Sequence, residues 1–341
     1  MALLDPKASA ELIMNSSKHV FIKQEGISAL AKTLLQQMKE DQHALQFKSW
    51  KTHPLNPKVA NEQALDWIFV VDALNFSFWT PSNDVKFMVR YGNEEHTGYW
   101  SLCAAVNRAL DDGVPITSAE YCKNITEAQA AHIFRSDSQT EIPMLKERVT
   151  VLRDIGSVLM DEFGGKFANC VTRANGCAQA LMRLIVNHFP CFKDEGLFNG
   201  QQVSFYKRAQ ILVADTWACF EGIGHGHFVD IDTITMFADY RIPQTLVYFG
   251  AISYSDQLMK LLEDDHMFNS GDVMEMEIRA GSIWAVELLA VEMNKLMLND
   301  PELIGRKVNA ILLDHYLWDY RRAHDDKTRH IPYHKIRCIF Y

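Results

Sequence analysis

Apolar residues recur at helical spacing along most of this chain, and this periodicity constrains the fold more than any other feature. Asp5 followed by Pro6 predicts the start of the first helix, because Asp is a preferred capping residue and Pro fits the first helical position. Further helices are predicted at about residues 26–40, 59–74, 100–111, 126–134, 143–163, 176–188, 203–220, 229–237, 241–252, 255–263, 272–297 and 301–321. We therefore expect a mainly α-helical fold.

Two shorter segments depart from the helical pattern. Residues 50–57 contain Pro54 and Pro57, which predict a rigid non-helical connector around His53. Residues 75–79 alternate polar and aromatic side chains, and residues 85–93 read as a strand followed by a turn, so we expect one small antiparallel β-ribbon near residues 75–99. With neither a low-complexity linker nor a repeat of fixed period, the chain is interpreted as a single domain over residues 1–341.

Charge and cysteine usage restrict the class of partner and the compartment. A formal net charge of -9 argues against gripping a nucleic-acid backbone, since such binding depends on Lys and Arg neutralising many phosphates. The first residues lack the pattern of a secretory signal, and no apolar run predicts a membrane span. Seven cysteines without a CxxC pair fit reduced thiols, with Cys103, Cys170 and Cys177 expected to pack as small apolar groups. We expect a cytoplasmic location, with presence in the nucleus left open.

Residues 228–244 set three acids, three aromatics and a cation in an otherwise apolar stretch, which is costly unless the polar groups have partners or a function. If a helix begins near Tyr240, Asp239 is either a plain N-cap or an ionised carboxylate that stabilises a developing cation or activates water. Phe237 is suited to stacking on a flat heterocycle, and Arg241 to pairing with a phosphate. Position alone favours the capping role for Asp239, while its neighbours favour a catalytic role.

A second candidate lies in residues 310–320, where Asp314 interrupts a nearly continuous apolar run. At helical spacing Asp314 shares a face with Trp318, so an acid beside an aromatic wall is suited to a planar base that carries N–H donors. The alternative, that Asp314 pairs with an arginine or caps a loop, stays equally open.

The remaining candidates have weaker patterns. The pair Lys207 and Arg208 precedes an apolar helix and is either solvated or in contact with a phosphate. His53 in its proline-bounded loop is either a structural histidine or a ligand contact. His225 and His227, separated by one glycine, lack the spacing of a metal site, so we expect neither a metal nor a cofactor.

Four long motifs resemble the queuosine salvage protein family, and the likeness extends over essentially the whole chain. They are residues 98–110, 206–217, 234–244 and 311–320. The resemblance implies an N-glycosidase that hydrolyses queuosine 5′-phosphate to free queuine and ribose 5-phosphate, within a fold similar to helix-hairpin-helix DNA glycosylases.

The same resemblance implies roles for individual residues. Asp239 matches the catalytic aspartate that follows the hairpin. His53, Phe237 and Asp314 would contact the base, while Tyr240, Arg241 and Lys207 would contact the ribose and the phosphate. The partners it implies are this nucleotide and queuine, without a membrane or a nucleic acid.

Two departures from the DNA enzymes bear on the substrate. Residues 231–235 lack a Gly-Pro-Gly hairpin, and the chain is acidic, so both features argue against DNA binding. Two alternatives stay open at this point: a nucleic-acid glycosylase or tRNA-binding protein, and a queuine-binding protein without catalytic activity.

Overall fold

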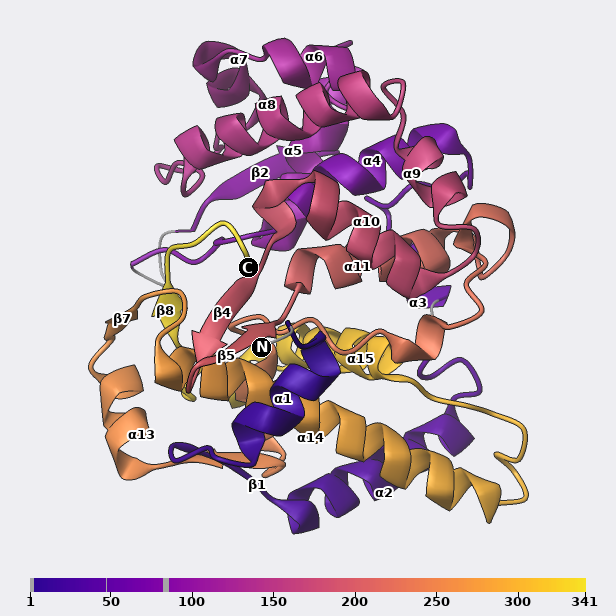
Figure 1. Ribbon diagram of the computed structural model, residues 1–341, viewed down its shortest axis with the longest axis vertical. Coiled ribbons are helices and arrows are strands. Elements are labelled where there is room, and N and C mark those ends of the chain that lie inside the picture. Colours follow the sequence, from indigo (N-terminus) through magenta and orange to yellow (C-terminus); the bar gives the residue numbers. More distant parts are fainter. Residues whose placement is uncertain (1–2, 47, 82–85) are drawn as a thin grey trace. The chain divides into compact units, whose positions relative to one another are not determined.

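The computed structural model describes residues 3–46, 48–81 and 86–341 (Figure 1). The described chain is mainly helical, as predicted, and forms two compact units. The first unit comprises Met1–Phe47, Asp194–Gln210 and Asp232–Ile336, and the second comprises Lys48–Lys193, Ile211–Ile231 and Arg337–Tyr341. No helix within the described ranges is long and apolar enough to cross a lipid bilayer.

The first unit is built around one long helix. Its elements are α1 (Pro6–Met14), β1 (Val20–Ile22), α2 (Gln24–Glu40), β4 (Glu195–Phe198), β5 (Gln201–Ser204), α12 (Ile242–Tyr248), β6 (Ile252–Tyr254), α13 (Asp256–Glu263), β7 (Met267–Phe268), α14 (Val273–Leu298), α15 (Ala310–Ala323), α16 (Asp325–Thr328) and β8 (Lys335–Ile336). Helix α14 packs against α12 and, as Figure 1 shows, against α1, α2 and α15. Most of its first half is buried, which is expected of a helix covered on all sides.

Short strand pairs complete the first unit. Strands β1 and β6 pair antiparallel, as do β4 and β5, whereas β7 and β8 pair parallel. Strand β1 lies directly on α14 at Gly281, where a Cβ atom would come within 2.6 Å of the Val20 side chain. Glycine at this position therefore allows the close approach of strand and helix.

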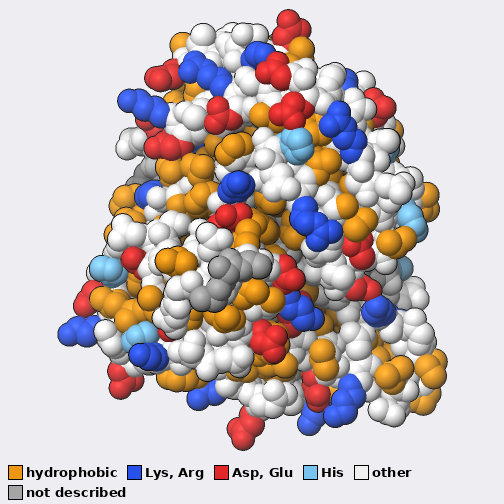
Figure 2. All heavy atoms as spheres, viewed as in Figure 1, with side chains coloured by type: hydrophobic (Ala, Val, Ile, Leu, Met, Phe, Trp, Pro, Cys, Tyr) orange, Lys and Arg blue, Asp and Glu red, His pale blue; other side chains and the backbone are white. Residues whose placement is uncertain are grey.

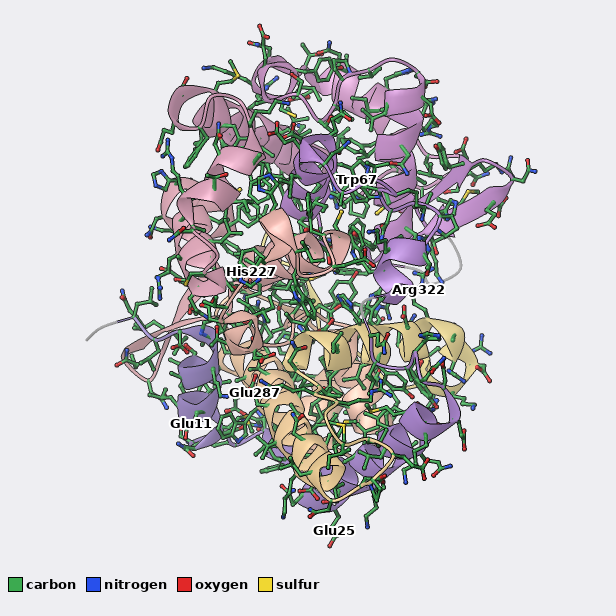
Figure 3. The ribbon with its side chains drawn as sticks, turned by 90° about the vertical axis from the view of Figure 1, so that its right-hand side faces the viewer. Glu11, Glu25, Trp67, His227, Glu287 and Arg322 are labelled. Atoms are coloured by element: carbon green, nitrogen blue, oxygen red, sulfur yellow. The ribbon has the colours of Figure 1, made fainter. Side chains whose placement is uncertain are left out.

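The start of the chain is fixed as predicted. Asp5 caps α1 by accepting a 2.8 Å hydrogen bond from the Ala8 amide, and Pro6 occupies the first turn. Lys7 of α1 forms an ion pair with Glu287 of α14 at 2.5 Å, and Figure 3 labels Glu11 and Glu287 on these two helices.

The second unit packs its helices around an aromatic cluster. Its elements are α3 (Lys48–Thr52), α4 (Glu62–Ala73), β2 (Met88–Tyr91), β3 (Glu94–Thr97), α5 (Tyr99–Asp111), α6 (Ala119–Asn124), α7 (Glu127–Ile133), α8 (Leu145–Glu162), α9 (Phe167–Arg173), α10 (Ala178–His188), the 3-10 turns η1 (Pro190–Phe192) and η2 (Gly224–Gly226), and most of α11 (Lys207–Cys219). Phe69 of α4 stacks on Phe167 of α9 with ring centroids 4.7 Å apart, and Phe189 lies 5.1 Å away.

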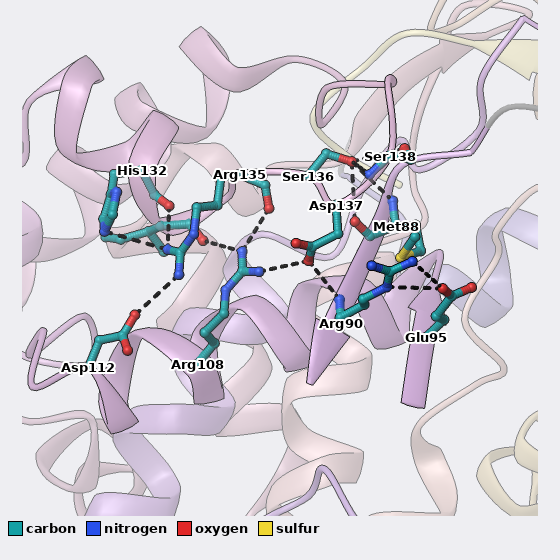
Figure 4. A network of polar contacts seen from close by, with 11 residues as sticks. Met88, Arg90, Glu95, Arg108, Asp112, His132, Arg135, Ser136, Asp137 and Ser138 are labelled. Carbon is teal, nitrogen blue, oxygen red and sulfur yellow. Dashed lines mark hydrogen bonds and ion pairs between the residues drawn. The ribbon is translucent and has the colours of Figure 1, made fainter. Parts of the chain in front are cut away.

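The predicted β-ribbon is present, but it is shorter than expected. Strands β2 and β3 form an antiparallel hairpin held by Asp137, which accepts hydrogen bonds from the Arg90 amide at 2.8 Å and from Arg108 at 2.9 Å (Figure 4). The strand expected at residues 75–79 is wrong, because these residues form no strand. Residue 85, where the second strand was predicted to begin, lies outside the described residues.

The segment that should have been a strand is fixed by a buried arginine. Arg148 of α8 donates to the backbone carbonyls of Leu74 and Phe76, each at 2.6 Å, and stacks on the Phe76 ring. A side chain thus supplies the backbone partners that a neighbouring strand would have provided.

Several predicted helix boundaries are also wrong. Only residues 231–233 of the predicted helix at 229–237 are helical, as the 3-10 turn η3 (Ile231–Thr233), and α15 begins at Ala310 rather than near residue 301. Helix α11 begins at Lys207, since Gln201–Ser204 pair as β5. Helix α3 includes residues 50–52, so the non-helical connector begins only at His53.

Candidate active site

The segment at residues 234–239 is buried and non-helical, and side chains from three other elements supply its hydrogen bonds. The Thr235 amide donates to the Gln210 side chain at 2.8 Å, and the Phe237 amide donates to Asp314 at 2.9 Å. The Ala238 carbonyl accepts from Arg279 at 3.1 Å. These contacts satisfy backbone groups that a helix would have paired internally, so they stabilise the non-helical conformation of the segment.

Asp239 ends this segment and its carboxylate caps the next helix, although that helix begins at Ile242, two residues later than predicted, with Arg241 at the N-cap position itself. Its Oδ1 accepts hydrogen bonds from the amides of Arg241 and Ile242, both at 2.8 Å, at the start of α12. The side chain remains partly exposed. Burial raises the pKa of Asp239 above its ordinary value, although the charge of Lys207 and the two amides oppose this effect. The cap therefore orients a carboxylate whose charge is only partly compensated.

A buried ion pair positions both Asp239 and Lys207. Arg279 of α14 is 1% exposed and makes two contacts with Asp194, at 2.9 and 2.5 Å, while its Nε donates to the Ala238 carbonyl. Asp194 also accepts from the Lys207 amide at 3.1 Å. One pair thus fixes the residue before Asp239 and the first residue of α11.

Asp314 and Phe237 are joined through the Phe237 backbone amide. Asp314 of α15 is 4% exposed and accepts from the Phe237 amide, so it does hold a loop, the structural role left open by the sequence. The Phe237 ring lies 6.0 Å from the His315 ring. Burial lowers the pKa of His315 to about 4, which keeps this imidazole neutral at neutral pH.

Tyr240 and Arg241 form an aromatic and cationic group with Tyr333. The two tyrosine rings are 5.6 Å apart, and the Arg241 guanidinium carbon lies 3.9 Å from the Tyr333 ring centroid. The Arg241 Nη1 donates to Gln244 at 3.1 Å. The ribose and phosphate candidates next to Asp239 are therefore ordered by stacking.

Lys207 and Arg208 are buried, at 6% and 1% exposure, so the solvated alternative for this pair is wrong. Since burying a charge is costly without compensation, both cations require interactions inside the fold.

His53 belongs to the second unit, whereas the other six candidate residues belong to the first. Its ring stacks on Trp100 of α5 with a centroid separation of 3.4 Å and an angle of 5°. Its Nδ1 lies 3.3 Å from the Leu55 amide, which donates to it. The loop thus holds the imidazole in one orientation.

The histidines at 225 and 227 also lie in the second unit, where His225 packs edge-on to Phe220. Within the described parts of the chain, no group of three or more His, Cys, Asp or Glu side chains is arranged to hold a metal ion. All seven cysteines are free thiols, as expected.

Sequence reasoning missed Arg279, Asp194, Gln210, His315 and Tyr333. Arg279 carried a signal, because it follows two acids inside an apolar helical run, where unpaired charge is rare. The others lie in ordinary patterns, and only their three-dimensional neighbours distinguish them.

Comparison with known proteins identifies the family of this chain. Residues 55–341 match the family model described as queuosine salvage protein. The chain belongs to the queuosine salvage protein family. This confirms the resemblance found in the four motifs.

Relatives named queuosine 5′-phosphate N-glycosylase/hydrolase span animals, fungi and bacteria. The chain is 48% identical to the one from Mus musculus over 339 residues, which cover 99% of both chains. It is 38% identical to the one from Schizosaccharomyces pombe over 97% of this chain and 98% of the relative. The one from Sphaerobacter thermophilus is 39% identical over 82% of each chain.

Proposed function

We propose that this chain is an N-glycosidase that hydrolyses queuosine 5′-phosphate to queuine and ribose 5-phosphate. The observation that carries this proposal is the nearly full-length alignment with relatives named for that activity. The product queuine would then be available for tRNA modification.

Asp239 is the proposed catalytic residue. Breaking the bond between base and ribose builds positive charge at the anomeric carbon, and a fixed carboxylate stabilises that charge most in the transition state. The two backbone amides at the start of α12 hold one oxygen of Asp239 in place. Preorganisation of this kind avoids reorientation during the reaction, and the same carboxylate would orient the attacking water.

The base would be recognised by an aromatic ring and an acid. Phe237 provides a flat apolar surface, and Asp314 offers carboxylate oxygens that accept hydrogen bonds from a heterocycle. Their mutual contact through the Phe237 amide supports a joint role. His53, presented by its stack on Trp100, is proposed as a further base contact.

The ribose and phosphate would lie on the side of Asp239 opposite to the base contacts Phe237 and Asp314. Tyr240 and Arg241 follow it directly in the chain, and the charge of Lys207 acts on its carboxylate. A phosphate monoester carries between one and two negative charges at neutral pH, which makes these cations suitable partners.

We further propose that the two units act as one glycosidase domain, similar in fold to helix-hairpin-helix DNA glycosylases, and that the protein works in the cytoplasm without a metal or cofactor. What supports the fold comparison is that Asp239 follows a non-helical segment and binds the amides at the start of α12, where the resemblance expects the catalytic aspartate.

The test replaces Asp239 by Asn and follows queuine release from queuosine 5′-phosphate by chromatography. Asn caps helices about as well as Asp, so the fold should persist while the rate falls by at least about a hundredfold. The matched control is Asp232→Asn, where the exposed ion pair with Lys307 is lost while the amide oxygen can still accept from Asn309. Near-normal release by the Asp239 variant would remove its catalytic role.

The same assay tests the function as a whole. Wild-type protein should release queuine with and without a chelator. Binding of queuine without any cleavage would instead identify a carrier, and strongly salt-dependent binding to RNA would identify a nucleic-acid enzyme.

A further inference from the structure

A group of arginines gathers beside α12 in the first unit. Arg241 directly precedes α12, and Arg321 and Arg322 lie in the last turn of α15. Helix α12 packs against both α15 and α16, with Thr245 donating to the Leu317 carbonyl at 3.3 Å. Burial, together with the charges of Arg241 and Arg322, lowers the pKa of Arg321 to about 10, while Asp325 opposes this effect. The arginines are therefore close enough to repel one another.

The positive charges of Arg241 and Arg321 are only partly balanced by groups of the protein. Among the described residues, no carboxylate lies within ion-pair distance of Arg241, whose Nη1 donates to the neutral Gln244. Arg321 forms an ion pair with Asp325 at 2.8 Å, but its Nε is buried without a hydrogen-bond partner in the described part of the chain.

Tyr333 provides an independent observation at the same place. It is 8% exposed and lies under the Arg241 guanidinium, yet its hydroxyl group has no hydrogen-bond partner among the residues that the structure describes. A buried unpaired hydroxyl is costly, so it indicates a group that the bound state supplies.

We propose that Arg241, Arg321 and Tyr333 form the subsite for the phosphate monoester of the nucleotide substrate. This inference rests on the proposed function and adds to it Arg321 and Tyr333, two residues that the sequence motifs did not single out. A phosphate monoester brings negative charge and three acceptor oxygens, which match two guanidinium forks and one hydroxyl donor.

The position of the proposed phosphate subsite relative to Asp239 agrees with the order of base, ribose and phosphate in a 5′-nucleotide. Asp239 holds the Arg241 amide, so the proposed anion site begins two residues from the carboxylate that faces the anomeric carbon. The ribose would lie between the two. Arg322, labelled in Figure 3, is exposed and lies over the Trp318 ring, so it adds to the positive field without belonging to the subsite.

The test compares queuosine 5′-phosphate with its nucleoside, queuosine, in four variants. Arg321→Gln should lower kcat/KM for the nucleotide by about tenfold or more and change that for the nucleoside by less than about twofold. Arg321→Lys keeps the charge but not the two-pronged guanidinium, so its kcat/KM for the nucleotide should fall less than that of Arg321→Gln. Tyr333→Phe keeps the ring under Arg241 and should cost about fivefold on the nucleotide alone. Arg329→Gln, an exposed arginine that follows α16, is the control and should change neither substrate.

Equal losses on nucleotide and nucleoside, or no loss on either, would overturn the subsite while leaving the proposed function intact. Wild-type protein that cleaves neither compound would overturn the proposed function instead. Calorimetry with ribose 5-phosphate and with ribose then decides the subsite separately. Only the phosphorylated sugar should bind, and Arg321→Gln and Tyr333→Phe should weaken it whereas Arg329→Gln should not; unchanged binding in those two variants refutes the inference.

Discussion

Replacing Arg279 by Met tests how the site is held in place. The substitution keeps a long side chain but removes both contacts with Asp194 and the hydrogen bond to the Ala238 carbonyl. Asp194 and Glu275, at 3% and 1% exposure, would then be buried without their cation.

The stability cost of Arg279→Met follows from the burial of Arg279 and its carboxylate partners. Removing one partner of a buried ion pair costs about 3–5 kcal/mol, because the remaining charge is left uncompensated. At about 1.4 kcal/mol per tenfold change, the unfolding equilibrium should shift by between about a hundredfold and a few thousandfold. The control Lys307→Met breaks only the exposed ion pair with Asp232 and should cost less than about 1 kcal/mol.

The assay is urea unfolding of the wild type, Arg279→Met, Asp194→Asn and the double variant. The double variant should recover part of the lost stability, since it no longer buries a lone carboxylate at residue 194. In the milder variant Arg279→Lys, kcat should fall more than KM changes, because the backbone that carries Asp239 shifts. A cost below about 1 kcal/mol for Arg279→Met, or strictly additive costs in the double variant, would refute the reasoning.

Two further predictions concern pH. Lys207→Met removes a charge that lowers the pKa of Asp239, so the acid limb of the kcat/KM profile should move to higher pH. The control Lys307→Met should leave the limb in place. An unchanged limb in the Lys207 variant would contradict the effect of the Lys207 charge on Asp239. The buried His315 has a pKa of about 4, against 6.5 for the free group. Between these pH values the unfolded chain binds more protons than the folded protein, so the stability of the wild type should fall as the pH drops from 6.5 to 4, by at most about 3 kcal/mol. His315→Gln should remove this component in unfolding curves measured across that range, and an identical pH dependence in both proteins would show that another group is responsible.

The local signals in the sequence predicted much of the helical framework. Asp5 and Pro6 marked the start of α1 correctly, because capping and the geometry of proline act within one turn. The capping role of Asp239 was predictable for the same reason, since its partners are the amides two and three residues later. Membership of the family was equally readable, because the motifs are long and continuous in the chain.

Predictions failed where distant side chains replaced local hydrogen bonds. Residues 229–237 have helical periodicity, yet Gln210 and Asp314 bind backbone amides of this segment, and Arg279 binds the carbonyl that follows it, so residues 234–237 are not helical. Residues 75–79 alternate like a strand, but Arg148 of α8 takes up the carbonyls of this segment. A pattern in the sequence cannot report partners that lie tens or hundreds of residues away.

The sequence by itself determined which residues carry the chemistry that we propose: Asp239 and its neighbours Phe237 and Arg241. Tertiary structure decided how they are held, through the Asp194 and Arg279 pair and the contact of Asp314 with the Phe237 amide. It also decided that Arg321 and Tyr333 lie beside Arg241. The physical reason is that capping acts over one helical turn, whereas compensation of buried charge depends on which helices pack together.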